Sequence, residues 1–111
     1  MNFKQKILDL IGISKRANML KCGSDTVIKE IQSRRACVVF IANDASLETI
    51  KKFSDKCNFY NVTYITIFNT IELSSIIGKD NIKLISVSDK GLSKTMIENY
   101  LKYKEDMVNE G

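Results

Sequence analysis

The strongest constraint on the fold is the uninterrupted apolar run of residues 36–42, ACVVFIA, which ends at Asn43 and Asp44. The run is short, contains β-branched and aromatic residues, and is bounded by turn residues, all of which favour a strand over a helix. A strand with no polar alternation is buried on both faces of its sheet, as in α/β proteins. The run therefore predicts a central strand over residues 37–42, covered by helices on both sides.

The rest of the chain alternates helical and extended patterns around that strand. Apolar residues three and four apart predict a helix over residues 3–17, and a short edge strand follows at residues 19–22. Further helices are predicted to begin at Ser24 or Asp25, at Asp44 or Ser46, at Asn69, and at Ser88 or Asp89. Strands are predicted over residues 62–68 and 82–87. This order predicts an α/β fold, a three-layer α/β/α sandwich with a mixed four-stranded sheet.

The third predicted helix places Leu47, Ile50, Phe53 and Cys57 on its inward side, and the fourth ends at Gly78. With 111 residues, no proline and no repeat, the chain forms a single domain of residues 1–104, followed by a charged tail of residues 105–111 that is expected to fray. No apolar run approaches the ~20 residues of a membrane span. The N-terminus is too polar for a signal peptide, so we expect a cytoplasmic protein with no membrane partner.

The chain contains no histidine, which excludes histidine-based general bases, Ser-His-Asp triads and histidine-containing zinc sites. Its cysteines, Cys22, Cys37 and Cys57, lack CxxC spacing and indicate reduced thiols without a metal. Cys37 is expected to be a small core residue. Neither GxGxxG nor a Walker A sequence occurs, so no cofactor is predicted. These absences favour a protein that is not an enzyme.

The net charge of +4 is unevenly distributed. Residues 1–35 carry eight basic and three acidic side chains, whereas the remaining 76 residues carry nine basic and ten acidic ones. Such asymmetry is typical of a surface that faces a polyanion. A lysine-rich surface that only maintains solubility explains the charge equally well.

Three polar loops are predicted to meet at one edge of the sheet: residues 23–29, 43–46 and 78–83. The first is a glycine-led helix start, whose unpaired N–H groups form an anion site. Lys29 follows Asp25 by four residues, so both project from the same face of that helix. The lysine either donates to guanine O6 and N7 or forms an Asp25–Lys29 pair worth about 0.3–0.5 kcal/mol.

The order and spacing of several motifs resemble the bacterial, YlxQ-like branch of the L7Ae/L30e ribosomal protein family, the kink-turn RNA binders. The motifs are ISKRANMLKCG, the GxxxxxK helix, VVFIANDAS, KKFSDKCNFYNVTY, IELSSIIGK and VSDKG, and they extend over nearly the whole chain. The resemblance implies an α/β/α sandwich that grips the bent backbone and sheared G·A pairs of a kink-turn. The residues that it places against RNA are Gly23, Ser24, Asp25, Thr26, Lys29, Asn43, Asp44, Ala45, Gly78, Lys79, Asp80 and Asn81.

Two positions depart from the family pattern. Archaeal members have Asn-Glu where this chain has Asp25-Thr26, so the amide donor is replaced by a carboxylate that only accepts hydrogen bonds. In the third loop, which covers an unpaired nucleotide in the family, the segment of residues 80–82 is more polar than the family's apolar cover. Both departures lie in the predicted contact surface.

We therefore expect a non-catalytic RNA-binding protein, a ribosome-associated monomer that recognises kink-turn or similarly bent RNA by shape and backbone contacts. One alternative is a protein-interaction module of the same fold that has lost its RNA edge. Another is the substrate-binding partner of an RNA-modifying enzyme. A falling affinity with added salt would separate the first reading from the second.

Overall fold

The computed structural model describes residues 2–110, with side chains placed through Val108. These residues form five helices and four strands, in the order α1 (Phe3–Arg16), β1 (Leu20–Cys22), α2 (Ser24–Gln32), β2 (Val38–Ile41), α3 (Leu47–Phe59), β3 (Thr63–Ile65), α4 (Thr70–Ile77), β4 (Leu84–Val87) and α5 (Lys90–Glu110). Every predicted element is present, although β3 and β4 are shorter than expected. No described helix is both long enough and apolar enough to cross a membrane.

The four strands form one mixed sheet in the order β1-β4-β2-β3. β4 runs antiparallel to both β1 and β2, whereas β2 and β3 are parallel. The predicted central strand is thus hydrogen-bonded on both sides, and all four of its residues are buried. The sheet and its order confirm the predicted mixed α/β architecture.

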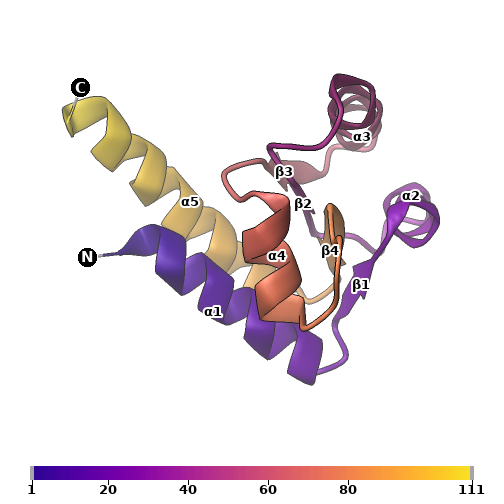
Figure 1. Ribbon diagram of the computed structural model, residues 1–111, viewed down its shortest axis with the longest axis horizontal. Helices are drawn as coiled ribbons and strands as arrows, with labels where there is room; N and C mark the ends of the chain where they lie inside the picture. Colours follow the sequence, from indigo (N-terminus) through magenta and orange to yellow (C-terminus); the bar gives the residue numbers. More distant parts are fainter. Residues whose placement is uncertain (1, 111) are drawn as a thin grey trace.

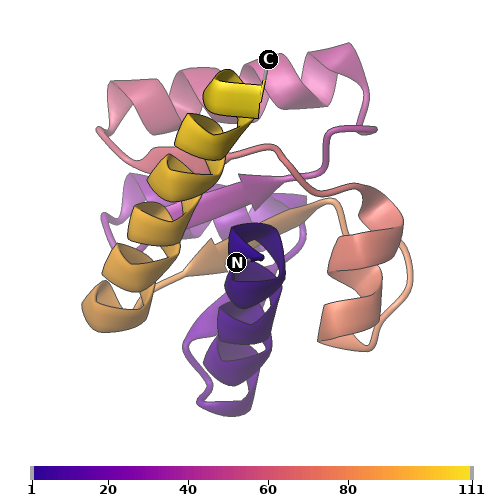
Figure 2. The ribbon, with the colours of Figure 1, turned by 90° about the vertical axis from the view of Figure 1, so that its left-hand side faces the viewer.

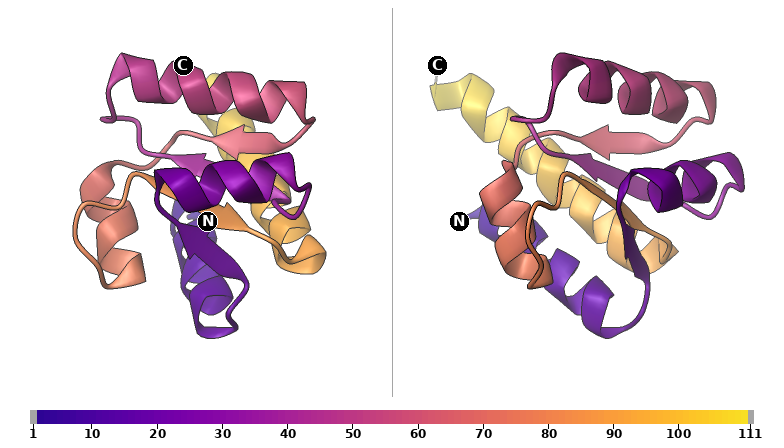
Figure 3. Two further views of the ribbon diagram at one scale, coloured as in Figure 1. Left: turned by 90° about the vertical axis from the view of Figure 1, so that its right-hand side faces the viewer. Right: turned by 45° about the vertical axis from the view of Figure 1, so that its right-hand side comes forward.

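Helices cover both faces of the sheet, so the molecule has three layers (Figure 1). α2 and α3 lie on one face, and α1, α4 and α5 lie on the other. α1 and α5 pack against each other in the outer layer, with α4 beside α1 (Figure 2). The N-terminal ends of α2 and α3 lie on the same side of the molecule as α4 (Figure 3, left).

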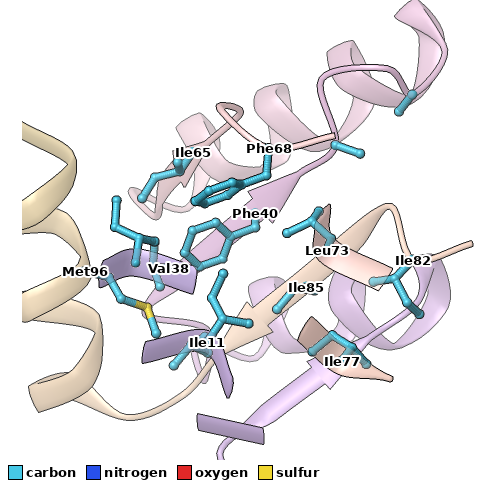
Figure 4. Close-up of a cluster of buried hydrophobic side chains, with 14 residues drawn as sticks. Ile11, Val38, Phe40, Ile65, Phe68, Leu73, Ile77, Ile82, Ile85 and Met96 are labelled. Atoms are coloured by element: carbon cyan, nitrogen blue, oxygen red, sulfur yellow. The ribbon is translucent and has the colours of Figure 1, made fainter. Parts of the chain in front are cut away.

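The core has two parts because the central strand sends alternate side chains to opposite faces. Val38 and Phe40 point toward the layer of α1, α4 and α5, where Phe40 meets Phe68 at a ring-centroid distance of 6.1 Å (Figure 4). Val39 and Ile41 point toward α2 and α3. The two-sided burial is therefore confirmed for residues 38–42, but Cys37, which we expected in the core, is half-buried and lies just before the strand.

The capping of α4 follows the sequence, but the capping of α2 does not. Asn69 and Glu72 form the expected capping box, and Gly78 ends α4 in the left-handed region at φ 76°. For α2 we expected Ser24 or Asp25 as the cap, and this was wrong, because Gly23 is the N-cap and no side chain caps the helix. The N–H of Gly23 donates to the Leu84 carbonyl at 3.1 Å, so the chain stays paired with β4 until the helix begins.

One other expectation, that Leu47 faces inward, was wrong. Leu47 is 86% exposed, because it lies in the first turn of α3, before the residues of that helix that pack on the sheet. α5 continues through Glu110 and so makes residues 105–110 helical where we expected a frayed tail. The division at residue 104 and the fraying of this segment stay predictions of the sequence, and Gly111 lies outside the described residues.

Candidate functional site

The three predicted loops meet at one end of the sheet, which we call the loop edge (residues 23–29, 43–46 and 78–83). β1 and β2 both end there and the antiparallel β4 begins there. Backbone hydrogen bonds tie the segments together: Gly23 N–H reaches the Leu84 carbonyl at 3.1 Å, and Ala42 N–H reaches the Lys83 carbonyl at 2.8 Å. The sheet therefore brings together residues that lie up to 60 positions apart in the sequence.

The start of α2 forms the first part of the loop edge. Gly23 has φ 97° and ψ 149°, a conformation open essentially to glycine alone. Ser24, Asp25 and Thr26 follow in the first turn and are all exposed. With no side chain capping this helix, its first N–H groups face outward and carry the partial positive charge of the helix dipole.

Lys29 and Asp25 share a face of α2, as predicted, but no ion pair joins them among the residues that the structure describes. Both side chains are exposed. Of the two roles that the sequence allowed for Lys29, the structure therefore does not show the ion pair with Asp25. The ammonium of Lys29 is available to an external acceptor beside the uncapped helix start.

Asp44, in the second loop, is engaged with the start of α4. Its carboxylate accepts hydrogen bonds from the Thr70 N–H at 2.9 Å and from the Thr70 hydroxyl at 2.7 Å. The hydroxyl bond is the main cause of a lowered pKa at Asp44, and the Thr70 N–H and the charge of Lys83 add to it, while partial desolvation opposes it. Asp44 thus holds the second loop against α4 as an ionised acceptor.

The third loop borders an open hollow of about 500 Å³ beside α4. Its lining combines the predicted residues of this loop with one face of the helix: Thr70, Ile71, Ser74, Ser75, Gly78, Lys79, Asp80 and Asn81. The Ser74 hydroxyl accepts from the Ile82 N–H at 2.8 Å, and Asn81 accepts from the Lys83 ammonium at 2.8 Å. These bonds fix the loop while the side chains of Lys79 and Asp80 remain exposed.

The structure changes the roles of some predicted residues and adds others. Ala45 is 7% exposed and belongs to the core, so its side chain is not presented at the loop edge. Thr70 and Lys83 connect the second loop to the third. Thr70 donates to Asp44 of the second loop, and the Lys83 ammonium lies 3.4 Å from the Thr70 hydroxyl. Lys15 also reaches this region, and its ammonium donates to the Ile77 carbonyl. No local pattern signals Thr70 or Lys15, because each bonds to a partner far along the chain, whereas Lys83 lies within the predicted third loop.

The basic excess of residues 1–35 does not gather wholly at the loop edge. Arg35 pairs with the buried Glu30 at 2.8 Å, and Lys4 pairs with Glu72 at 3.5 Å. Lys29 is exposed at the loop edge, whereas Lys15 reaches it with an ammonium already bonded to the Ile77 carbonyl. The charge count alone therefore overstates how many of these cations face one ligand.

The cysteines lie apart from one another. Within the described part of the chain, no three His, Cys, Asp or Glu side chains converge on a point where a metal ion could bind. Cys57 is buried, and burial raises the pKa of its thiol to about 12. The Cys37 thiol lies 3.4 Å from the Ser88 carbonyl, and Cys22 is half-buried.

Comparison with known proteins supports the family resemblance that the sequence motifs indicated. Residues 5–97 match the model of the ribosomal protein L7Ae/L30e/S12e/Gadd45 family. The chain is 40% identical over 88 residues to the RNA-binding protein YlxQ of Bacillus subtilis, an alignment that covers 79% of this chain and 88% of YlxQ. It is 27% identical over 104 residues to the large ribosomal subunit protein eL8 of Thermoplasma acidophilum, covering 93% of this chain and 86% of eL8.

The chain also superposes on the solved structure of a protein of unknown function from Bacillus halodurans C. The TM-score is 0.81 at 33% sequence identity, and the superposition covers 85% of this chain and 95% of the other. The family model extends over most of the chain, and the relative from Bacillus subtilis shares well over a third of the aligned residues. The resemblance that the motifs indicated is therefore confirmed. The chain belongs to the ribosomal protein L7Ae/L30e/S12e/Gadd45 family.

Proposed function

We propose that this protein binds RNA without catalysis and that the loop edge is its RNA-binding surface. The observation that supports this most directly is the start of α2, which has no side-chain cap and presents an unpaired Lys29 on the same helix. Such a start offers N–H donors and positive charge to a phosphate. The relative from Bacillus subtilis is named an RNA-binding protein, and the family is one of ribosomal proteins.

We further propose that the preferred RNA is a kink-turn or a similarly bent structure. The N–H groups of Ser24, Asp25 and Thr26 would take a backbone phosphate, and the Lys29 ammonium would reach guanine O6 and N7. The hollow beside α4 is a candidate place for an unpaired nucleotide next to Gly78 and the following loop. Recognition would rest on the shape of the bent backbone, with few contacts to base edges.

The test is a binding titration against two RNAs of equal length, one with a kink-turn and one fully paired, each at several salt concentrations. We expect tighter binding to the kink-turn and an affinity that falls as salt rises, because phosphate contacts release counterions. Equal affinity for both RNAs would overturn kink-turn recognition. Absence of RNA binding at low salt would instead favour the protein-interaction module of the same fold.

Ribosome association is a separate proposal, prompted by the family and by its resemblance to a large-subunit protein. It predicts that the protein co-sediments with ribosomal particles in a sucrose gradient of a cell lysate and moves to the top after RNase treatment. Sedimentation with the free proteins in both samples would refute it. The expected cytoplasmic location and monomeric state are tested by cell fractionation and by light scattering of the purified protein.

A further inference from the structure

A second surface, far from the loop edge, combines exposed aromatic and basic side chains. It extends from the middle of α3 to the C-terminal end of that helix and includes Arg34, just after α2, and we call it the distal patch. Its members are Arg34, Lys52, Lys56, Phe59 and Tyr60. α2 and α3 run in the same direction, so their N-terminal ends lie at the loop edge and their C-terminal ends lie at the distal patch (Figure 3, left).

Phe59 is the central feature of this patch. Phe59 is the last residue of α3, and its large apolar side chain is 77% exposed. It belongs to neither core cluster. The ring meets Tyr60 edge-on, with 4.9 Å between centroids and an interplanar angle of 70°. An open hollow of about 510 Å³ lies beside the two rings and is lined also by Lys52, Asp55 and Lys56.

The charge around these rings is positive. Arg34 lies in a left-handed turn at φ 63° and places its guanidinium carbon 5.5 Å from the centroid of the Tyr60 ring. Lys52 and Lys56 flank the hollow on the α3 side. Asp55, the acidic member of the lining, forms an exposed ion pair with Lys51 at 2.9 Å, so the cations of this region outnumber its carboxylate.

We propose that the distal patch is a second RNA-binding site, which takes one unpaired nucleotide by stacking its base on Phe59. Lys52, Lys56 and Arg34 would hold the flanking phosphates. An exposed ring flanked by cations is the arrangement by which proteins bind single-stranded nucleic acid without sequence preference. The positive charge of Lys52, Lys56 and Arg34 complements the phosphates of RNA, which favours RNA over an uncharged partner surface. The proposal requires only unpaired RNA and is independent of kink-turn recognition.

The length of α3 sets the separation of the two sites. The helix has 13 residues and so spans about 20 Å from the loop edge to Phe59, with Lys52 near its middle. An RNA bound at the loop edge would therefore reach Phe59 only through an unpaired extension that follows the outer side of α3. We expect RNAs with such an extension to bind more tightly than the same RNAs without it.

The experiment measures fluorescence anisotropy of a labelled oligouridine and of a kink-turn RNA without extensions, with the full chain. Phe59→Ala is expected to weaken oligouridine binding about tenfold, the scale of one lost base–aromatic stack, and to leave kink-turn binding unchanged. Phe59→Tyr keeps an aromatic ring and is expected to retain the affinity. Val108→Ala, which truncates another exposed apolar residue, is the matched control.

A second measurement locates the bound RNA independently of affinity. Photocrosslinking of an oligouridine that contains 4-thiouridine, followed by mass spectrometry, should label the peptide that contains Phe59 and Tyr60. The Lys52→Ala/Lys56→Ala double variant should reduce this labelling, and Lys94→Ala should not. Equal oligouridine affinity for Phe59→Ala and Val108→Ala, no oligouridine binding at low salt, or crosslinks confined to the loop edge would each overturn the proposal.

Discussion

The carboxylate of Asp44 joins the loop after the central strand to the first residue of α4, accepting from the Thr70 N–H at 2.9 Å and from its hydroxyl at 2.7 Å. These residues are 26 positions apart in the sequence. The pair gives Asp44 two functions, since the carboxylate satisfies an unpaired N–H at the start of a helix and also orients the second loop. The negative charge that the second loop brings to the proposed RNA surface is thereby already engaged with protein donors and Lys83.

The Asp44–Thr70 contact predicts a pH-dependent contribution to stability. Because hydrogen bonds from Thr70 lower the pKa of Asp44 below its ordinary value of 3.8, the ionised carboxylate stabilises the folded state above that value. The contribution is lost as the pH falls through the lowered pKa of the folded protein. Asp44→Asn should therefore unfold more easily than the parent at pH 7, by a difference that shrinks below about pH 4.

Chemical denaturation of both proteins between pH 2 and pH 7 measures this difference. Asp106→Asn, at an exposed position of α5, is the control and should match the parent throughout. A difference between Asp44→Asn and the parent that stays constant with pH would contradict the assigned cause.

Lys29→Ala should weaken binding to a kink-turn RNA far more than Lys102→Ala. Lys29 is exposed at the loop edge without a protein partner, whereas Lys102 lies on α5 near the Phe3 ring. The expected loss for Lys29 is about 1–3 kcal/mol, the scale of one good base-edge contact. Filter binding at fixed salt decides the matter, and equal losses for the two variants would remove α2 from the proposed surface.

Asp25→Asn should tighten kink-turn binding by about 1–3 kcal/mol, because it restores an amide donor and removes a negative charge near phosphates. The carboxylate lies in the first turn of α2, where its interaction with the helix dipole stabilises the helix by about 0.3–1 kcal/mol. We therefore expect a slightly lower melting temperature together with the higher affinity. Unchanged or weaker binding would mean that Asp25 is adapted to a different RNA.

Replacing all three cysteines should preserve RNA binding and lower stability mainly through Cys57. Its thiol is buried, with a pKa raised to about 12, so it should react with a thiol reagent only after unfolding. Truncating this side chain should cost about 1–2 kcal/mol. Thiol labelling, metal analysis and RNA binding of the triple alanine variant provide the test. Stoichiometric zinc in the parent protein, or loss of RNA binding on Cys22→Ser without unfolding, would indicate a metal or redox role.

The features that were predicted correctly depend on residues close together in the sequence. The apolar run around β2 marks burial on both faces, and the Asn69–Glu72 capping box with Gly78 fixes both ends of α4. Each of these signals lies within a few residues, and hydrophobic period and capping chemistry act over that range.

The features that were missed depend on distant partners. Gly23 is the N-cap of α2 in place of Ser24 or Asp25, and its N–H bonds to the carbonyl of the distant Leu84. Thr70 joins the loop edge through Asp44, which lies 26 residues before it. Leu47 has the helical phase of an inward residue but lies before the part of α3 that packs on the sheet. Local pattern does not specify which chain segment faces such a residue.

The position of β2 between two hydrogen-bonded neighbours also affects the association rate of a ligand at the loop edge. The second loop leaves this strand directly, and its Asn43 N–H is held by the Phe68 carbonyl at 2.9 Å. Backbone that is already ordered loses little conformational entropy on binding. Association should then be limited by diffusion and charge steering, with a single kinetic phase and a rate that falls with salt, and not by a folding step of the protein.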